Sequence, residues 1–165
     1  TTIEWYDFYI YATAAALVFN KVFFPELSAT EGVIGALLTY GVGFVSRPLG
    51  ALVFGHFGDR MGRKVALIVT LVGMGVCTTL MGLLPGYATI GWVAPMTLAI
   101  LRFLQGIAVG GEWGGAVLLG LEQTKSRRTF FAGFAQAGSP SGLLLATIVF
   151  AIVGLMPDDA FESFG

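Results

Sequence analysis

The sequence predicts an all-α protein that crosses a membrane several times. Three observations carry this prediction: hydrophobic residues make up 56% of the 165-residue chain, charged residues only 12%, and the mean hydropathy is +0.82. A water-soluble domain typically carries about 25% charged residues, so this chain has too few charges to cover a surface that faces water. The 24 glycines agree with this class, because small residues let membrane helices approach closely.

Five apolar segments are long enough to cross a bilayer, which takes about 20 apolar residues in a helix. Short polar stretches with turn residues separate these segments. Asp7 lies deep in the first segment, with few residues left on its inner side, so we expect the first helix to begin upstream of Thr1. We therefore expect the chain to be part of a longer polypeptide. The predicted helices cover residues 1–19, 32–54, 65–84, 92–121 and 129–155.

The positions of the basic residues predict the orientation of these helices. Cytoplasmic connections of membrane proteins carry an excess of Lys and Arg, and six of the nine basic residues lie in the second and fourth connections. The opposite side has only Lys21. We therefore expect a multi-pass membrane protein with its N-terminus and its even-numbered connections in the cytoplasm. The six residues are Arg60, Arg63, Lys64, Lys125, Arg127 and Arg128.

Five ionisable residues lie inside the apolar segments. Each charge at the centre of a membrane helix costs about 2.5–3.5 kcal/mol, so these groups need partners, a water-filled cavity or neutralisation. They either serve a function, or they form structural ion pairs or reach toward the membrane surface. Three polar residues of the first segment, Glu4, Asp7 and Tyr11, share one helical face. The five ionisable residues are Glu4, Asp7, Arg47, Arg102 and Glu112.

Two rows of mostly small residues at four-residue spacing each include one of these arginines. Such rows allow close helix packing, and an arginine within each row favours a polar cavity between the packed helices. Pro48 follows Arg47 and removes a backbone hydrogen bond, which predicts a bend there. The first row is Gly35, Thr39, Gly43, Arg47, Ala51 and Gly55, and the second is Arg102, Gly106, Gly110 and Gly114.

Two motifs resemble those of the major facilitator superfamily. Residues 55–64, Gly-His-Phe-Gly-Asp-Arg-Met-Gly-Arg-Lys, are similar to its signature loop between helices two and three. Residues 102–110, which begin with Arg102 and contain Gly106 and Gly110, are similar to its fourth-helix pattern. The resemblance implies a twelve-helix transporter built from two six-helix halves, each with inverted three-helix repeats. The chain would supply helices one to five, without the sixth helix or the C-terminal half.

A narrower resemblance is to the metabolite:proton symporter family, through residues 3–8, 47–51 and 104–113 and four positions of the fifth helix. Members of that family take up osmolytes such as proline and betaine, or carboxylates such as shikimate, with the proton gradient. The resemblance therefore implies proton-coupled symport of a small organic solute; the alternative is a facilitative or sodium-coupled carrier. The fifth-helix positions are Gln136, Gly138, Pro140 and Gly142.

Three sets of site residues follow. For proton coupling we expect Asp7 as the carrier and Arg102 as its partner, with Glu4 or Glu112 as further acids, because burial favours a neutral carboxyl and a nearby arginine favours a charged one. An arginine can bind a carboxylate through two parallel hydrogen bonds, so we expect a substrate that bears a carboxylate, with Arg47 or Arg102 as its contact. Gln105, Gln136 and Tyr11 are further substrate candidates. Gating is expected at Gly55, Asp59, Arg60, Gly62, Arg63, Lys64, Glu122 and Arg128.

Other classes fit the sequence less well. An enzyme would need a nucleophile with a base or a set of metal ligands, and the only histidine, His56, and the only cysteine, Cys77, have no such companions. A channel would need a repeated pore-lining element, and none is evident. The net charge of −1 gives no electrostatic case for nucleic acid. We expect no cofactor and no metal; the expected partners are the lipid bilayer, a small organic solute, protons and the missing C-terminal half.

Overall fold

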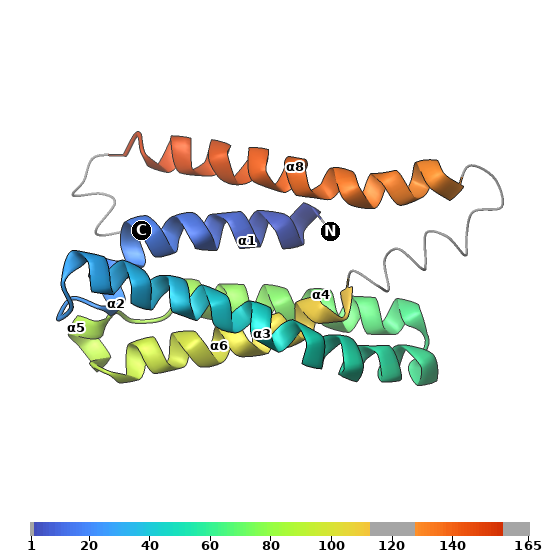
Figure 1. Ribbon diagram of the computed structural model, residues 1–165, viewed down its shortest axis with the longest axis horizontal. Coiled ribbons are helices and arrows are strands. Elements are labelled where there is room, and N and C mark those ends of the chain that lie inside the picture. Colours follow the sequence, from blue (N-terminus) through green and yellow to red (C-terminus); the bar gives the residue numbers. More distant parts are fainter. Residues whose placement is uncertain (1, 113–127, 157–165) are drawn as a thin grey trace.

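The structure is a computed structural model that describes residues 2–112 and 128–156, without the side chains of 128–132 and 134–136. Every regular element in this part of the chain is a helix, and the long helices run side by side along the longest axis of the molecule (Figure 1). The elements are α1 (Thr2–Ala14), η1 (Ala15–Phe19), α2 (Asn20–Phe23), α3 (Ala29–Met61), α4 (Arg63–Gly82), α5 (Tyr87–Ile90), α6 (Val93–Gly110) and α8 (Arg128–Val153).

The first predicted span is one continuous helical segment, α1–η1–α2, which ends at Phe23 rather than at residue 19. Its middle part, η1, is a π-helix, whose wider turns interrupt the regular α-helical pattern. Ala15, at the start of the π-helix, has no exposed surface, and Leu17 is largely exposed. The chain then leaves the helix at Phe24, where the sequence predicts a turn.

The start of α3 is fixed by its own side chains. The Ser28 side chain accepts a hydrogen bond from the Glu31 backbone N–H at 3.4 Å, and the Glu31 carboxylate accepts one from the Ser28 backbone N–H at 3.1 Å. This reciprocal capping box satisfies two backbone donors that the first helical turn leaves without partners. The long helix α3 therefore begins a few residues before the predicted apolar segment.

The connection between α3 and α4 differs from the prediction. We expected a polar stretch over residues 55–64, but α3 continues to Met61 and α4 begins at Arg63, so Gly62 alone separates the two helices. Gly62 has φ +92°, a conformation that glycine adopts without the steric cost of a Cβ. A helix of 33 residues is about 50 Å long, which exceeds a hydrocarbon core of about 30 Å. The polar end of α3 therefore extends past an apolar core while it keeps its helical hydrogen bonds.

Glycines bring α3 and α6 into close contact, as the two rows of small residues predict. A Cβ at Gly106 would overlap the Gly43 carbonyl and the Ser46 hydroxyl, and a Cβ at Gly110 would overlap the Arg47 carbonyl. The contacts with the Gly43 and Arg47 carbonyls join one helix backbone to the other, so a larger residue at Gly106 or Gly110 would push the helices apart. The fourth glycine of the α6 row, Gly114, lies outside the described residues.

The last helix, α8, lies beside α1 (Figure 1). A Cβ at Gly142 would lie 2.6 Å from the backbone nitrogen of Tyr6, so the two backbones nearly touch there. Three residues along α1, the hydroxyl of Tyr9 is 3.2 Å from the hydroxyl of Ser139. Gly138, Pro140 and Gly142, which carry the fifth-helix resemblance, therefore belong to the helix that packs against α1.

Three helices in the described part of the chain are long and apolar enough to cross a membrane: α3, α4 and α6. A further apolar stretch, Ala137–Val153, forms the C-terminal part of α8. The predicted first span contains a π-helix, and the predicted fourth span matches α6 as far as Gly110, two residues before the described part stops at 112. Many apolar side chains of α3 face outward, among them Leu38, Val45 and Leu52, as expected of a helix in contact with lipid.

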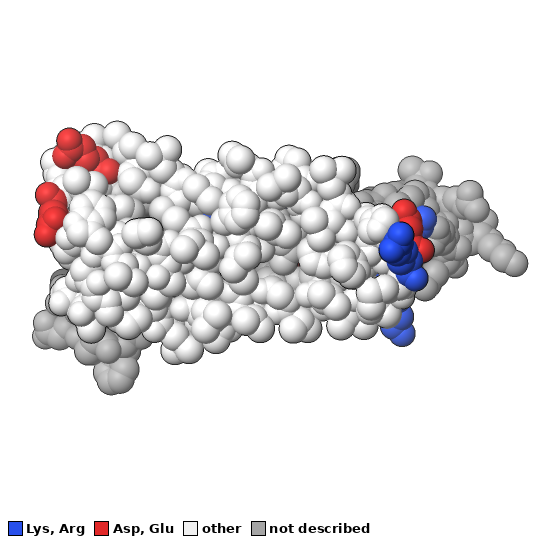
Figure 2. All heavy atoms as spheres, turned by 90° about the horizontal axis from the view of Figure 1, so that it is seen from below, with Lys and Arg blue, Asp and Glu red and all other residues white. Residues whose placement is uncertain are grey.

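Charged side chains are sorted to the two ends of the bundle. Figure 2 shows basic residues gathered at one end and acidic residues at the other, with a nearly uncharged surface between them on the face shown. The basic end carries the exposed residues Arg60 and Lys64 together with Asp59, and the acidic end carries Glu26 and Glu31. An uncharged middle between charged ends is the surface expected of a membrane-spanning bundle.

Candidate functional site

The centre of the bundle holds an ion pair between α1 and α6. The Arg102 Nη1 atom is 3.3 Å from the Asp7 Oδ2 atom, and the two side chains are only 1% and 7% exposed. These are the two residues that the sequence predicts as proton carrier and partner, and they lie 95 positions apart in the chain. Since a buried charge without a partner is far more costly than a paired one, each side chain stabilises the charged form of the other.

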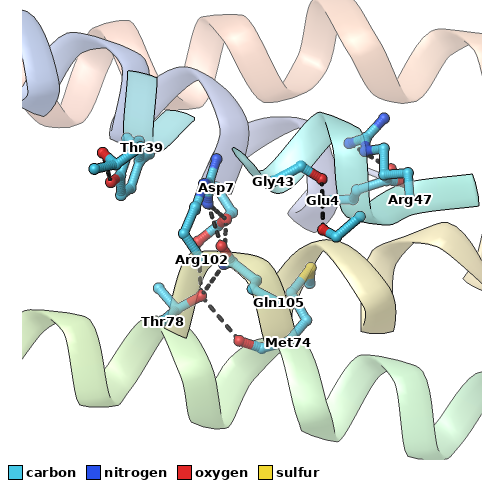
Figure 3. Close-up of polar contacts among 11 residues, drawn as sticks. Glu4, Asp7, Thr39, Gly43, Arg47, Met74, Thr78, Arg102 and Gln105 are labelled. Carbon is cyan, nitrogen blue, oxygen red and sulfur yellow. Dashed lines mark hydrogen bonds and ion pairs between the residues drawn. The ribbon is translucent and has the colours of Figure 1, made fainter. Parts of the chain in front are cut away.

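Two more side chains complete a polar network around Asp7 (Figure 3). Gln105 donates from Nε2 to Asp7 Oδ2 at 2.6 Å, and its Oε1 accepts from Arg102 Nη1. Thr78 of α4 donates to Asp7 Oδ1 at 2.7 Å and accepts from Gln105 Nε2 at 2.8 Å. One oxygen of the Asp7 carboxylate thus accepts from α4, and the other accepts from α6. Thr78 was missed in the sequence, where it is one of many small polar residues in apolar segments.

A second ion pair lies one turn earlier on α1. The Arg47 Nη2 atom of α3 is 3.3 Å from the Glu4 Oε1 atom, and the Glu4 side chain is 3% exposed against 24% for Arg47. The predicted substrate contact and one of the predicted proton acids are therefore partners of each other. Arg47 keeps part of its surface accessible and lines a cavity of about 400 Å³ together with Glu4, Trp5 and Phe44.

Aromatic rings surround both guanidinium groups. The Cζ atom of Arg47 is 4.0 Å from the ring centroid of Phe8, and the Cζ atom of Arg102 is 3.9 Å from that of Tyr11. Phe8 also lies 4.9 Å from the Arg102 Cζ atom, so its ring contacts both arginines. Cation–π contacts of this kind stabilise a desolvated guanidinium without neutralising it. Of these rings, only Tyr11 was a predicted site residue.

Tyr11 itself is held in place by a hydrogen bond to α3. Its hydroxyl is 2.7 Å from the hydroxyl of Thr39, which in turn donates to the Ala36 carbonyl at 2.6 Å. Tyr11 and Asp7 also line a cavity of about 210 Å³ that runs along α1 and the C-terminal half of α4. Thr78 lies on the wall of the same cavity. The Asp7 network therefore borders open volume inside the bundle.

Of the remaining predicted site residues, the structure describes some completely and others only in part or not at all. Glu112 is buried just after α6 and interacts electrostatically with Glu4. Gln136 is in α8, but its side chain lies outside the described part, as does that of Arg128. Glu122 falls in the undescribed segment 113–127.

The predicted gating residues of the α3–α4 junction come together at one end of the bundle. Gly55, Asp59 and Arg63 line a cavity of about 180 Å³, and the end of α6 contributes Gly110 and Gly111 to the same wall. Arg60 and Lys64 are exposed at this end, and Gly62 forms the junction itself. The junction therefore meets the end of α6 as well as the start of α4.

Apolar helices that enclose ionisable side chains define a polytopic membrane protein of the kind whose buried polar groups serve solute, ion or proton pathways. The family profile described as "Sugar (and other) transporter" matches residues 1–162. The chain belongs to this transporter family of the major facilitator superfamily, and the prediction that it is not an enzyme is confirmed. No solved structure matches the chain.

Curated relatives support the narrower resemblance. The chain is 50% identical over 165 residues to a shikimate transporter of Escherichia coli and 50% identical over 167 residues to an inner membrane metabolite transport protein of the same organism. It is 39% identical over 165 residues to a proline/betaine transporter of Salmonella typhimurium. These alignments cover 99%, 100% and 99% of this chain, but only 38%, 38% and 33% of the respective relatives. The chain thus spans little more than a third of the length of these proteins.

Proposed function

We propose that the protein containing this chain is a secondary active transporter that carries a small organic solute together with protons. The observation that supports this most strongly is the buried pair of Asp7 and Arg102, tied to Gln105 and Thr78 inside an apolar bundle. A carboxylate on one helix and an arginine on another form a site that can change its charge when the helices move apart. Coupling to protons requires such a change.

The proton step follows from the pairing. While Arg102 lies beside Asp7, the carboxylate is stabilised in its charged form. When alternating access separates the two side chains, burial favours the neutral form, so Asp7 takes up a proton from the side to which it is open. When the pair forms again, Asp7 releases the proton. Glu4 lies one turn away and is paired with Arg47, whereas Asp7 is paired with Arg102. The two acids therefore have different partners.

The substrate site is proposed at Arg47. Its guanidinium is partly exposed at a cavity of about 400 Å³ between α1, α3 and α6. That volume suits a small organic molecule, and the arginine favours one that bears a carboxylate. A shikimate transporter and a proline/betaine transporter are among the relatives, and all three of these solutes carry a carboxylate. We therefore expect a carboxylic acid or a betaine-type zwitterion. Of the other predicted contacts, Gln105 and Tyr11 do not line this cavity, and the side chain of Gln136 lies outside the described part.

The charged ends suggest the orientation and the gate. The basic end at the α3–α4 junction is proposed to face the cytoplasm, since cytoplasmic connections are rich in Lys and Arg. In this proposed orientation, the N-terminal end of α1 points toward the cytoplasmic side of the bacterial inner membrane. Asp59 and Arg63, beside the end of α6, are proposed to hold this side closed while the other side is open.

Transport measurements on the full-length protein in proteoliposomes test the proposal. Labelled shikimate, proline and glycine betaine are offered with an imposed proton gradient, a sodium gradient or no gradient. We expect uphill accumulation of one of these carboxylates with the proton gradient alone. Accumulation with sodium alone, or equilibration without a gradient effect, would establish the sodium-coupled or facilitative alternative.

The variant Asp7→Asn separates proton coupling from binding, because asparagine resembles the protonated acid in shape. We expect this variant to lose uphill accumulation while it still exchanges labelled for unlabelled solute across the membrane. Accumulation at the parental level would show that Asp7 is not the proton site. Loss of exchange together with loss of membrane insertion would instead mean that the Asp7–Arg102 pair only holds the helices together.

A further inference from the structure

Thr78 occupies a position in the Asp7 network that the transport proposal does not explain. Its hydroxyl oxygen is 2.7 Å from Asp7 Oδ1 and 3.0 Å from the Met74 carbonyl oxygen of its own helix, α4. Gln105 Nε2 approaches the same oxygen at 2.8 Å. All three neighbours and the hydroxyl are visible together in Figure 3. One hydroxyl hydrogen therefore lies within reach of two different acceptors.

Counting hydrogens shows what this arrangement permits. A threonine hydroxyl donates one hydrogen bond and accepts up to two. When Asp7 is charged, Thr78 donates to the carboxylate and accepts from Gln105. When Asp7 is protonated, its new O–H can donate to Thr78, whose own hydrogen then turns to the Met74 carbonyl. Only a rotation of the hydroxyl separates these two patterns, and the Thr78 hydroxyl, the Gln105 amide nitrogen and both Asp7 carboxyl oxygens keep a partner in both.

Gln105 also has both a donor and an acceptor, but its amide would have to flip and give up its bond from Arg102 to accept from a protonated Asp7. Arg102 on α6 is cationic and has no acceptor atom, so it stabilises only the charged carboxylate. The remaining ionisable groups that interact with Asp7 are Cys77 on α4 and Glu4 and Tyr11 on its own helix. On α3, the ionisable residues Arg47 and Tyr40 contact the ring of Phe8. Among the described side chains of α8, which packs on α1, none is ionisable.

We infer that Thr78 is a positioning residue for the proton site: it stabilises both protonation states of Asp7 by turning its hydroxyl hydrogen between Asp7 and the Met74 carbonyl. No covalent bond of Thr78 forms or breaks, and the proton stays on Asp7. This inference rests on the proposed role of Asp7 as the proton site. Its consequence is that Asp7 can lose Arg102 during transport without leaving a buried acid that has no hydrogen-bond partner.

Infrared difference spectroscopy of the full-length protein in lipid, recorded during a pH titration, tests the inference without a solute. The carboxyl C=O band that Asp7→Asn removes reports protonated Asp7. In Thr78→Val this band should move to higher wavenumber, because the acid loses its acceptor. Its pH midpoint should rise by about one unit, because the hydrogen bond lost from the charged carboxylate is stronger than the one lost from the neutral acid.

Thr79 supplies a matched control. It neighbours Thr78 but is exposed, and its hydroxyl donates to the Gly75 carbonyl at 2.8 Å. Thr79→Val and Thr78→Ser should both keep the parental band and midpoint. If Thr78→Val does not assemble in the membrane, Thr78→Cys, with its weak donor, should show a smaller shift in the same direction.

Two outcomes are distinguishable. A parental band and midpoint in Thr78→Val, or in Thr78→Cys where that variant replaces it, would overturn the inference and leave the proposed function intact. A titration in which Asp7→Asn removes no band would overturn the proposed proton site, and the role of Thr78 with it.

Discussion

Gly43 of α3 faces the guanidinium of Arg102 with almost no space between them. A Cβ at Gly43 would lie 3.1 Å from the Arg102 Nε atom and 3.4 Å from its Cγ atom. The absent side chain is thus what lets Arg102 lie between α3 and α1 and reach Asp7. Gly43 belongs to the predicted row of small residues, so the same glycine serves helix packing and the placement of the ion pair.

This contact predicts that Gly43→Ala impairs coupling. The added methyl group must displace Arg102 or α6, and overpacking of this kind costs about 1–3 kcal/mol. We expect proton-driven uptake in proteoliposomes to fall about tenfold, since 1.4 kcal/mol corresponds to a factor of ten. Gly41→Ala is the matched control, because nothing lies within 4 Å of a Cβ at Gly41. Equal uptake by the two variants would contradict the prediction.

Helix packing gives a second prediction, on stability. A Cβ at Gly106 would overlap the backbone of Gly43, so Gly106→Ala should separate α3 from α6 and lower the thermal unfolding midpoint of the purified protein. Gly75→Ala, where no atom lies within 4 Å of the new Cβ, should leave the midpoint unchanged or raise it slightly. A Gly106→Ala protein as stable as Gly75→Ala would show that the two helices do not pack as described.

The substrate proposal predicts a specific effect of Arg47→Lys. Lysine keeps the positive charge but cannot form two parallel hydrogen bonds with a carboxylate, and it stacks less well on Phe8. Hydrogen bonds to charged groups contribute about 1.5–3 kcal/mol, so affinity for the transported acid should fall about tenfold or more. Binding is measured by substrate-induced thermal stabilisation. Arg60→Lys, at the exposed basic end, should bind like the parent; unchanged binding in Arg47→Lys and Arg47→Ala would make Arg47 structural.

The proposed gate predicts that Asp59→Asn slows transport without affecting membrane insertion. Asp59 shares a cavity with Arg63 at the end of α6, and loss of its charge removes any ion pair that closes this side. The control is Glu26→Gln, which neutralises an exposed acid at the opposite end of the molecule. Initial uptake rates are compared at equal amounts of inserted protein. A parental rate in Asp59→Asn would exclude this residue from the gate.

Much of the architecture was predictable from composition and spacing. The apolar segments marked the long helices, because a membrane helix must be apolar over about 20 residues. Pro25, Pro85 and their neighbours marked the turns that the structure has outside its helices. The helix ends were less predictable. Residues 55–61 are polar and contain two glycines, yet they continue α3, since a helix outside the membrane needs no apolar face to keep its backbone hydrogen bonds.

The sequence by itself determined that the chain belongs in a membrane and that Glu4, Asp7, Arg47, Arg102 and Glu112 must be accommodated inside it, because a charge deep in an apolar segment is costly unless it is paired, hydrated or neutralised. The partners were decided by the tertiary structure. Asp7 pairs with Arg102 and Glu4 with Arg47 because α1 lies against α3 and α6 at one particular register. Thr78 joins Asp7 only because α4 approaches from a third side. Its hydroxyl is one of many in the sequence, and proximity alone distinguishes it.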